Sequence, residues 1–238
     1  MVRAAYFDCV GGASGDMILG ALVDAGASLD AVQAQLDVLG LPIALEDSTV
    51  SRAGVSARKV EVVTAPDQAH RTLADIRALV GAPDLPARIS ARALAVFERL
   101  ARAEGAVHGV ELEQVEFHEV GSLDAIADVV GVMIALDLLG IERCFVSTLP
   151  LGGGTVRARH GVLPVPGPAV VALLVESGLP AVPGVAGEGE RVTPTGAAIL
   201  AELAETGRPE MALVAAGTGA GSSDPEDRPN VLRAWIGD

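Results

Sequence analysis

The stretch "VRAAYFDCVGGASGDMILGALVDAG", residues 2–26, passes from one apolar segment through a glycine-rich turn into another. Residues 2–8 predict a buried strand, and residues 16–25 place their apolar side chains at helical spacing. The turn between them, "CVGGAS", is short and rich in glycine, which suits a direct connection from strand to helix. This stretch therefore predicts a strand and a helix in immediate succession, as in α/β and α+β domains.

Further along the chain, apolar spacing predicts helices and strands that alternate irregularly. A hairpin is predicted at residues 44–64, where β-branched residues are frequent and "SRAG" lies in the middle. Thr72 and Asp75 form a capping-box pattern, which predicts a helix ending near residue 80. The other predicted elements are helices at 28–39, 86–104, 123–139, 168–177 and 195–205 and strands at 144–149, 212–216 and 231–236. We predict one α/β (or α+β) domain over residues 1–238, with a mixed sheet flanked by helices.

The composition of the chain argues against several classes of function. Its 238 residues include 31 acidic and 17 basic side chains, a net charge of −14, and Lys59 is the only lysine. Nucleic-acid binding needs clustered Lys and Arg, so we predict no nucleic-acid partner. No apolar run approaches the ~18–20 residues that span a bilayer, and no secretory signal is evident, so we expect a cytoplasmic protein without a membrane partner. Cys9 and Cys144 do not make a disulfide framework.

The densest group of potential metal ligands is "FHEVGSLDAIAD", residues 117–128. If a helix begins near Ser122, Asp124 and Asp128 lie on one face of it, one turn apart, with His118 and Glu119 just before its first turn. Acidic residues are also common in first turns because the helix dipole stabilises them. That alternative explains Asp124 but neither Asp128 nor His118, so this stretch is a candidate site.

Four histidines lie beside Gly, Arg or acidic residues at expected element ends. A single histidine is more often structural than a ligand, and the spacings match no zinc-finger or "HExxH" pattern, so any metal site would combine distant segments. Imidazole suits nickel, zinc, copper and iron, whereas carboxylates alone suit magnesium or manganese. The candidate metal ligands are His70, His108, His118, His160, Asp8, Asp16, Asp124 and Asp128.

Three glycine-containing segments predict where a substrate binds. The turn after the first strand offers N–H groups to an anion, although the two aspartates beside it favour a cation or a ribose hydroxyl. In "PLGGGTVRARHG", two arginines would share one face of an extended segment and grip a phosphate or carboxylate. "RVTPTGAA" predicts a helix start with a threonine cap and proline at the first position. An ordinary tight turn and ordinary capping are the alternatives for the first and third segments. The candidate substrate-binding residues are Gly12, Ser14, Arg157, Arg159, Thr193, Thr195 and Gly196.

Six segments in this order resemble the LarC family of nickel-insertion proteins. They are "FDCVGGASGDMILGALVDAG", "HRTLADI", "FHEVGSLDAIADVVG", "PLGGGTVRARHGVLPVPGPA", "VTPTGAAIL" and "GTGAGSSDPEDRPNVLR". They extend from residue 7 to residue 233, so the resemblance covers essentially the whole chain. Agreement at six spaced motifs makes this resemblance specific.

The resemblance implies a function, a substrate and partners. LarC proteins are nickel chelatases (cyclometallases, of the lyase class) that insert Ni(II) into pyridinium-3,5-bisthiocarboxylic acid mononucleotide, which forms the nickel-pincer cofactor of lactate racemase. The metal enters between the two thiocarboxylate sulfurs and C4 of the pyridinium. Family members consume CTP with Mn(II) or Mg(II) and assemble as homo-oligomers. The family's C-terminal CTP-binding domain is absent from residues 1–238, so we expect turnover to need that domain or a separate chain.

The candidate residues fit this chemistry at three points. Imidazole and carboxylate hold nickel without competing with the softer sulfur and carbon ligands of the product. The arginines of "RARHG" and the helix start of "VTPTG" could bind the 5′-phosphate of the substrate. Loss of the C4 proton needs a base, for which we favour Glu119, with His118 on nickel; the sequence does not separate these two roles.

Two other functions are consistent with parts of the sequence. The first is a divalent-metal phosphohydrolase that uses Asp8, Asp16, Asp124 and Asp128, although four histidines are unusual for a hard-metal site. The second is a non-catalytic oligomerising domain in which the glycine turns and polar helix starts are purely structural. Binding of nickel and of a pyridinium mononucleotide distinguishes these alternatives from nickel insertion.

Overall fold

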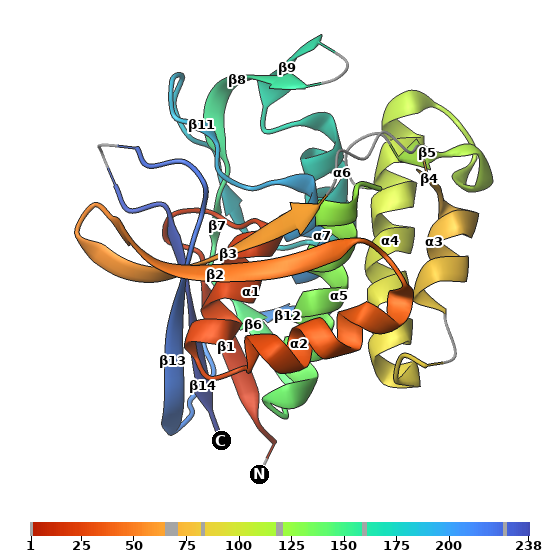
Figure 1. Cartoon of the computed structure of the whole chain (residues 1–238). Coiled ribbons are helices and arrows are strands. Elements are labelled where there is room, and N and C mark those ends of the chain that lie inside the picture. Colours follow the sequence, from red (N-terminus) through yellow and green to blue (C-terminus); the bar gives the residue numbers. More distant parts are fainter. Residues whose placement is uncertain (1, 65–70, 82–83, 118–120, 159–160, 226–227) are drawn as a thin grey trace.

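A mixed seven-stranded sheet forms one side of the molecule, and helices cover one of its faces (Figure 1). The computed structural model describes residues 2–64, 71–81, 84–117, 121–158, 161–225 and 228–238. The strand order is β12-β6-β1-β14-β13-β3-β2. The strands are β1 Ala4–Asp8, β2 Ile43–Arg52, β3 Val55–Thr64, β6 Arg143–Val146, β12 Ala204–Thr206, β13 Leu213–Ala220 and β14 Val231–Gly237. The prediction of a mixed sheet flanked by helices is confirmed.

Strand β1 lies in the middle of the sheet and shows how both ends of the chain build it. It pairs in parallel with β6 and antiparallel with β14. Ala5 and Phe7 point into the main core under the helices, because successive side chains of a strand alternate between faces. Tyr6 points to the opposite face, where it packs with Phe145 and Trp235.

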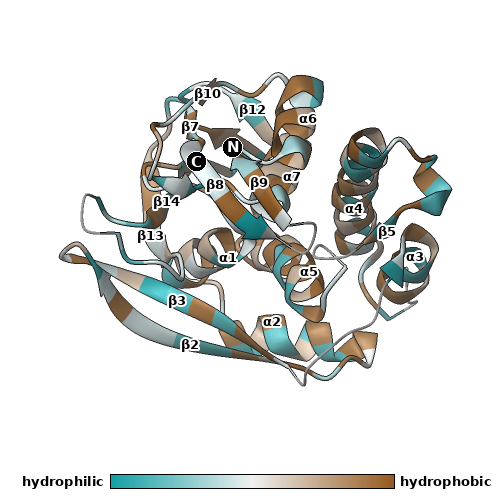
Figure 2. Ribbon diagram, turned by 90° about the horizontal axis from the view of Figure 1, so that it is seen from above, coloured by the Kyte–Doolittle hydropathy of each residue, from teal (hydrophilic) through white to brown (hydrophobic). Residues whose placement is uncertain are grey.

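The helices form successive layers on the covered face (Figures 1 and 2). Helix α1 packs on β13, β3 and β14, α5 packs between α1 and α4, and α3 packs on α4. Helix α5 is apolar on nearly all sides and largely buried, as expected for a helix enclosed by others. The helices are α1 Gly15–Asp24, α2 Leu29–Leu36, α3 Leu73–Val80, α4 Ala87–His108, α5 Leu123–Leu138, α6 Pro168–Ser177 and α7 Pro194–Leu203. No helix among the described residues is both long and apolar enough to cross a membrane.

Several predicted helix starts and one predicted turn are confirmed at the level of single hydrogen bonds. Thr72 and Asp75 form the capping box that opens α3. The Ser122 hydroxyl accepts a hydrogen bond from the Ala125 N–H at the start of α5, and Thr193 caps α7 with Pro194 at the first position. The hairpin of β2 and β3 turns at Ala53 and Gly54, within the "SRAG" segment.

The main additions to the predicted elements are short strands in the glycine-rich segments. β8 (Gly152–Ala158) and β9 (Gly161–Val165) form a hairpin, to which β11 (Gly189–Glu190) adds. Four two-residue strands, β4 (Arg71–Thr72), β5 (Glu116–Phe117), β7 (Leu149–Pro150) and β10 (Ala181–Val182), complete the described pairings. Glycine has a low strand propensity, which is why the sequence pattern of β8 did not predict a strand. Helix α4 also extends one turn beyond the predicted end, to His108.

Candidate functional site

The N-termini of three helices, α1, α5 and α7, meet at one place beside the sheet. Backbone bonds join the turn before α1 to the segment before α7: the Ala13 N–H donates to the Arg191 carbonyl at 2.8 Å, and the Thr193 N–H donates to the Ala13 carbonyl at 3.0 Å. A Cβ on Gly196 would lie 2.5 Å from the Ala13 carbonyl oxygen, so only glycine allows α7 to approach this closely. The glycines of both segments thus serve helix packing.

Two adjoining cavities open at this junction, with volumes of about 320 and 270 Å³. They share the carboxylates of Asp16, Asp124 and Asp128. The larger cavity is completed by Ser222 and by residues 59–63 of β3. Side chains with hydroxyl groups and one glutamate line the smaller cavity: Ser14, Ser122, Thr193, Thr195 and Glu190. We call the two cavities together the carboxylate hollow.

Asp128 is the most constrained acid of the carboxylate hollow. A Cβ on Gly15 would lie 2.5 Å from Asp128 Oδ2, so the first turn of α1 packs directly on this carboxyl group. Its Oδ1 is closed off from solvent and has no hydrogen-bond partner among the described residues. Burial, and then the nearby carboxylates of Asp16 and Asp124, raise the pKa of Asp128 well above its usual value, whereas Lys59 and the Asp16 N–H lower it.

Asp16 is held by contacts from three directions. The Ser14 hydroxyl donates to Asp16 Oδ1, the Met17 N–H donates to the same oxygen at 2.9 Å, and Lys59 Nζ donates to Oδ2. Lys59 also donates to Ser222 Oγ at 3.0 Å. The positive ends of α1, α5 and α7 further stabilise negative charge here. Even so, five acidic side chains (Asp16, Glu61, Asp124, Asp128 and Glu190) line the hollow with one ammonium group, so the carboxylate hollow favours a cation.

The structure brings together most of the predicted residues from the three helix starts. Ser14, Asp16, Asp124 and Asp128 line the hollow, together with Thr193 and Thr195. The two predicted glycines act through their backbone. Gly12 (φ +135°) and Gly196 provide close approaches between the turn and α7, and the Gly196 N–H already donates to Thr193 Oγ1.

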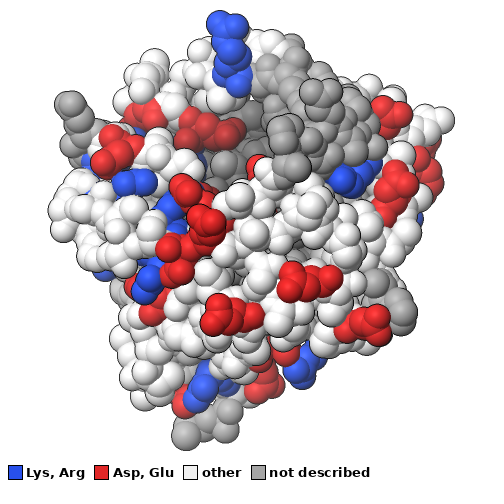
Figure 3. Space-filling model, viewed as in Figure 1, with Lys and Arg blue, Asp and Glu red and all other residues white. Residues whose placement is uncertain are grey.

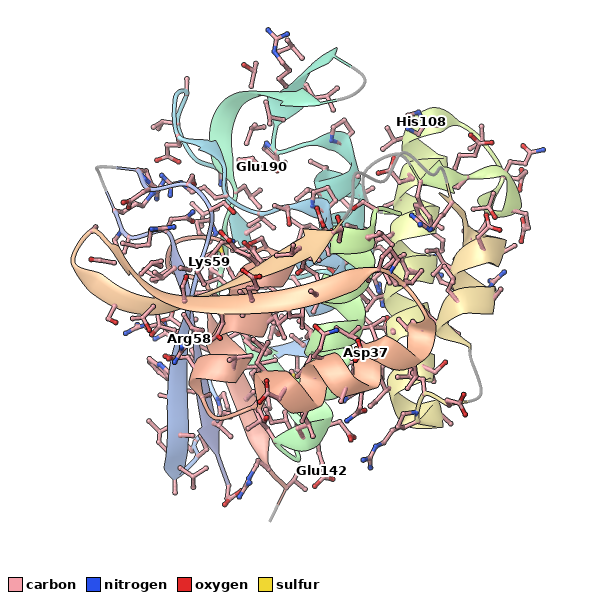
Figure 4. All side chains as sticks on the ribbon, viewed as in Figure 1. Asp37, Arg58, Lys59, His108, Glu142 and Glu190 are labelled. Atoms are coloured by element: carbon pink, nitrogen blue, oxygen red, sulfur yellow. The ribbon has the colours of Figure 1, made fainter. Side chains whose placement is uncertain are left out.

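Three other predicted residues lie away from the carboxylate hollow. Asp8 forms an ion pair with Arg233 on the opposite face of the sheet, because its position in β1 matches that of Tyr6 rather than Phe7. His108 lies at the end of α4, where its Nε2 is 3.3 Å from Glu104 Oε2. Figure 4 shows His108 far from Lys59. Arg157 is exposed on β8.

The remaining predicted residues, His70, His118, Glu119, Arg159 and His160, lie outside the described residues. The set of four aspartates expected of a phosphohydrolase is therefore not assembled, since Asp8 is elsewhere.

The donor atoms of the described residues set limits on metal binding. Among them, no group of three or more His, Cys, Asp or Glu side chains is arranged so that it could hold a metal ion. Burial raises the pKa of both Cys9 and Cys144 to about 12, so neither supplies a thiolate ligand at neutral pH. A cation in the carboxylate hollow would therefore complete its coordination with water or with atoms of a substrate.

Sequence reasoning missed five polar residues of the hollow: Lys59, Glu61, Ser122 as a lining residue, Glu190 and Ser222. One signal could have revealed Lys59, because it is the only lysine and lies in the predicted hairpin. The other four carry no such signal, since isolated serines and glutamates are common on protein surfaces. Figure 3 shows acidic side chains distributed over the front face with basic ones between them, in keeping with the net charge of −14.

Comparisons with known proteins give the family. The family model described as "Nickel insertion protein" matches residues 5–238. The chain belongs to the nickel insertion protein family. This confirms the resemblance to LarC proteins. Relatives described as "Putative nickel insertion protein" include those of Roseiflexus castenholzii (48% identical over 239 residues), Geotalea uraniireducens (48% over 242) and Synechococcus elongatus (50% over 243).

These matches cover all of this chain but only part of each nickel insertion relative. The covered share is 60% for Roseiflexus castenholzii, 61% for Geotalea uraniireducens and 60% for Synechococcus elongatus. The chain thus spans about three fifths of the length of these curated relatives. The comparison with solved structures gives no match.

Proposed function

We propose that this chain handles nickel and substrate in a nickel chelatase that converts pyridinium-3,5-bisthiocarboxylic acid mononucleotide into the nickel-pincer cofactor of lactate racemase. The observation that carries the proposal is the carboxylate hollow, where Asp16, Asp124 and Asp128 meet at three helix N-termini in a member of the nickel insertion family. The chemistry of the hollow supports each of the three tasks of such an enzyme: binding the metal, binding the mononucleotide and removing a proton.

Nickel is the cargo of this reaction, and the carboxylate hollow suits a metal that must be given up again. Oxygen ligands hold Ni(II) less strongly than the sulfur and carbon ligands of the product do, so transfer to the substrate is favourable. The described residues form no group of three or more side chains that could hold a metal ion, so the proposal requires the substrate's sulfurs or water as further ligands. Asp128 Oδ1 has no hydrogen-bond partner among the described residues, so turning this carboxyl group towards a cation would break no hydrogen bond at that oxygen.

The smaller cavity would suit the phosphate of the mononucleotide once a cation offsets the charge of the acids that also line it, which are Asp16, Asp124, Asp128 and Glu190. The hydroxyls of Ser14, Thr193 and Thr195 line it at the starts of α1 and α7, where helix dipoles attract anions. Thr193 Oγ1 accepts a hydrogen bond from the Gly196 N–H, which leaves the hydroxyl hydrogen free to donate to a phosphate oxygen. Metal and phosphate would thus occupy neighbouring parts of the same hollow.

Formation of the nickel–carbon bond releases the C4 proton of the pyridinium ring, and this proton needs an acceptor. Asp128 suits the task because its raised pKa makes its carboxylate a stronger base than an ordinary aspartate. We propose that Asp128 holds the metal before transfer and accepts the proton once the metal moves to the sulfurs and C4. Glu119 with His118 is the alternative pair, from the segment outside the described residues.

Two further parts of the proposal, consumption of CTP with Mn(II) or Mg(II) and assembly as a homo-oligomer, follow from the family resemblance alone. A cytoplasmic location is proposed from the sequence composition instead. We assign no CTP step to the described residues. The share of relatives' length that this chain spans is compatible with a CTP site in the remaining part of the family sequence.

The proposal is tested with the purified chain, Ni(II) and the dithio mononucleotide. Calorimetry should show that the chain binds both ligands. Mass spectrometry should detect the nickel-containing mononucleotide when CTP, Mn(II) and the remaining part of a family member are supplied. If the chain binds neither nickel nor the mononucleotide at millimolar concentration, it is a non-catalytic domain. If it instead releases phosphate from nucleotides with Mg(II) or Mn(II), it is a phosphohydrolase.

A further inference from the structure

Among the described residues that line the carboxylate hollow, Lys59 is the one basic side chain. It comes from β3, is only 6% exposed, and reaches Asp16 and Ser222 with its ammonium group. The ammonium group of Lys59 therefore contacts the Asp16 carboxylate, which faces the space proposed for nickel. Asp124 and Asp128 share that space and Glu61 also lines it, so one monovalent cation is set against four acids.

The choice of lysine at this position is informative in this chain. Of 17 basic side chains, all but Lys59 are arginines, and arginine provides most of the ion pairs between described residues, such as those of Arg99, Arg143 and Arg233. A guanidinium is a planar fork that fixes a carboxylate in a bidentate pair. An ammonium is a compact point charge on a flexible stem, which can leave one partner and turn to another. A purely structural pair in this chain would be expected to use arginine.

We propose that Lys59 is an internal substitute cation, which occupies the place of the divalent metal at Asp16 and is displaced when the metal binds. This inference rests on the proposed function, since it concerns the same hollow. Before the metal arrives, the ammonium relieves the repulsion among the carboxylates of Asp16, Asp124 and Asp128. When the metal arrives, its greater charge takes over Asp16, and Lys59 turns away from it.

Displacement makes nickel easier to release. Metal binding requires the conformation with Lys59 turned away, so the apparent affinity is lowered by the fraction of molecules in that conformation. As nickel passes to the substrate, Lys59 returns to Asp16 and prevents the metal from binding again. An enzyme that must give up its metal benefits from such a competitor.

Because Lys59 is the only lysine, its exposure can be followed in the wild-type protein. The chain is treated with an amine-acylating reagent in amine-free buffer, with and without Ni(II), and peptide mass spectrometry measures acylation of Lys59 against that of the N-terminal amine. We expect Ni(II) to raise the rate at Lys59 by about tenfold, as for a state shifted from minor to major population. Calorimetry in the same buffer measures nickel binding independently.

The two measurements separate failure of this inference from failure of the proposed function. If nickel binds while acylation of Lys59 is unchanged or slower, Lys59 is not displaced and the inference is wrong. If calorimetry shows no nickel binding, the proposed function fails and takes the inference with it. A rise in acylation together with binding supports both.

A pair of variants gives a second test. Lys59→Met removes the ammonium and keeps an apolar stem, so nickel should bind about tenfold more tightly. Arg58→Met is the matched control, because Arg58 is adjacent in β3 but pairs with Asp24 and Asp47 outside the hollow (Figure 4). It should change the affinity less than about twofold, since exposed charges are screened. Weaker nickel binding by Lys59→Met than by the wild type would overturn the inference. Thermal unfolding of both variants checks their folding, and the acylation test remains decisive if Lys59→Met does not fold.

Discussion

At the scale of single residues, the most informative group is the carboxyl group of Asp128, whose position is unfavourable for folding. Asp128 is packed against the backbone of Gly15, near two other acids, with an oxygen that no described group satisfies. An unsatisfied buried polar group costs stability and is usually retained for function. We therefore expect this aspartate to lower the stability of the protein while serving the site.

The first prediction concerns the pH dependence of stability. The raised pKa means that folded Asp128 keeps its proton to a higher pH than in the unfolded chain. Between the two pKa values the folded state binds more protons, so this group lowers stability progressively as the pH rises. Asp128→Asn removes the effect. Its Tm should exceed that of the wild type by about 2 °C or more at pH 8, and by less at pH 4.

Scanning calorimetry of both proteins at several pH values measures this difference. Groups whose pKa is lowered by hydrogen bonds, such as Asp75, Glu205 and Asp238, are common to both proteins and cancel. If Asp128→Asn is less stable than the wild type at pH 8, or if the Tm difference does not depend on pH, the ionised Asp128 carboxylate does not destabilise the folded protein.

The second prediction concerns the close approach of α1 to α5. In Gly15→Ala the new Cβ would lie 2.5 Å from Asp128 Oδ2 and 2.6 Å from its Cβ, so the helix must shift. We expect a loss of about 1–3 kcal/mol in the free energy of unfolding, as in other overpacked sites. Gly131→Ala in α5 is the control. There the nearest atom is a Leu19 methyl carbon at 3.2 Å, and the gain in helix propensity of about 1 kcal/mol offsets a small adjustment. If Gly15→Ala and Gly131→Ala change the free energy of unfolding in urea equally, the close contact between residue 15 and Asp128 is not the cause of the loss.

At the scale of elements, local sequence signals predicted the parts of the site that depend on neighbouring residues. Thr193 and Thr72 were recognisable as helix caps, and a helix start was expected near Ser122, because a cap is defined within four residues. The strand β8 was not recognisable, since its glycines allow close contacts with residues 184–189, a segment distant in the sequence.

The third prediction concerns the cap of α7, which also lines the smaller cavity. Thr193→Ala removes the acceptor for the Gly196 N–H and should lower the free energy of unfolding by about 1 kcal/mol. Thr193→Ser keeps a hydroxyl acceptor and should leave the free energy of unfolding nearly unchanged. Thr72→Ala removes a comparable cap from α3, away from the hollow, and should cost a similar amount. Only Thr193→Ala should also weaken binding of the mononucleotide, measured by calorimetry. Equal binding by the two alanine variants would remove Thr193 from the phosphate site.

At the scale of the whole molecule, the site is a product of topology that local patterns do not contain. β1 and β14 come from opposite ends of the chain, and the bridge between Ala13 and Val192 also joins segments that are distant in the sequence. The sequence predicted that acids from distant segments converge, and for Asp16, Asp124 and Asp128 they do. It could not tell that Asp8 faces the other side, because the direction of a strand residue depends on which face of the sheet the helices cover.

The central claim, that the carboxylate hollow binds the nickel ion, is tested most directly by calorimetric titration of Ni(II) into the wild type, Asp128→Asn and Asp8→Asn. Both variants replace one aspartate by asparagine, but Asp8 pairs with Arg233 on the opposite face of the sheet. We predict binding about tenfold or more weaker in Asp128→Asn, a loss of about 1.4 kcal/mol, and unchanged binding in Asp8→Asn. Nickel affinity that is the same in Asp128→Asn as in the wild type would contradict the account.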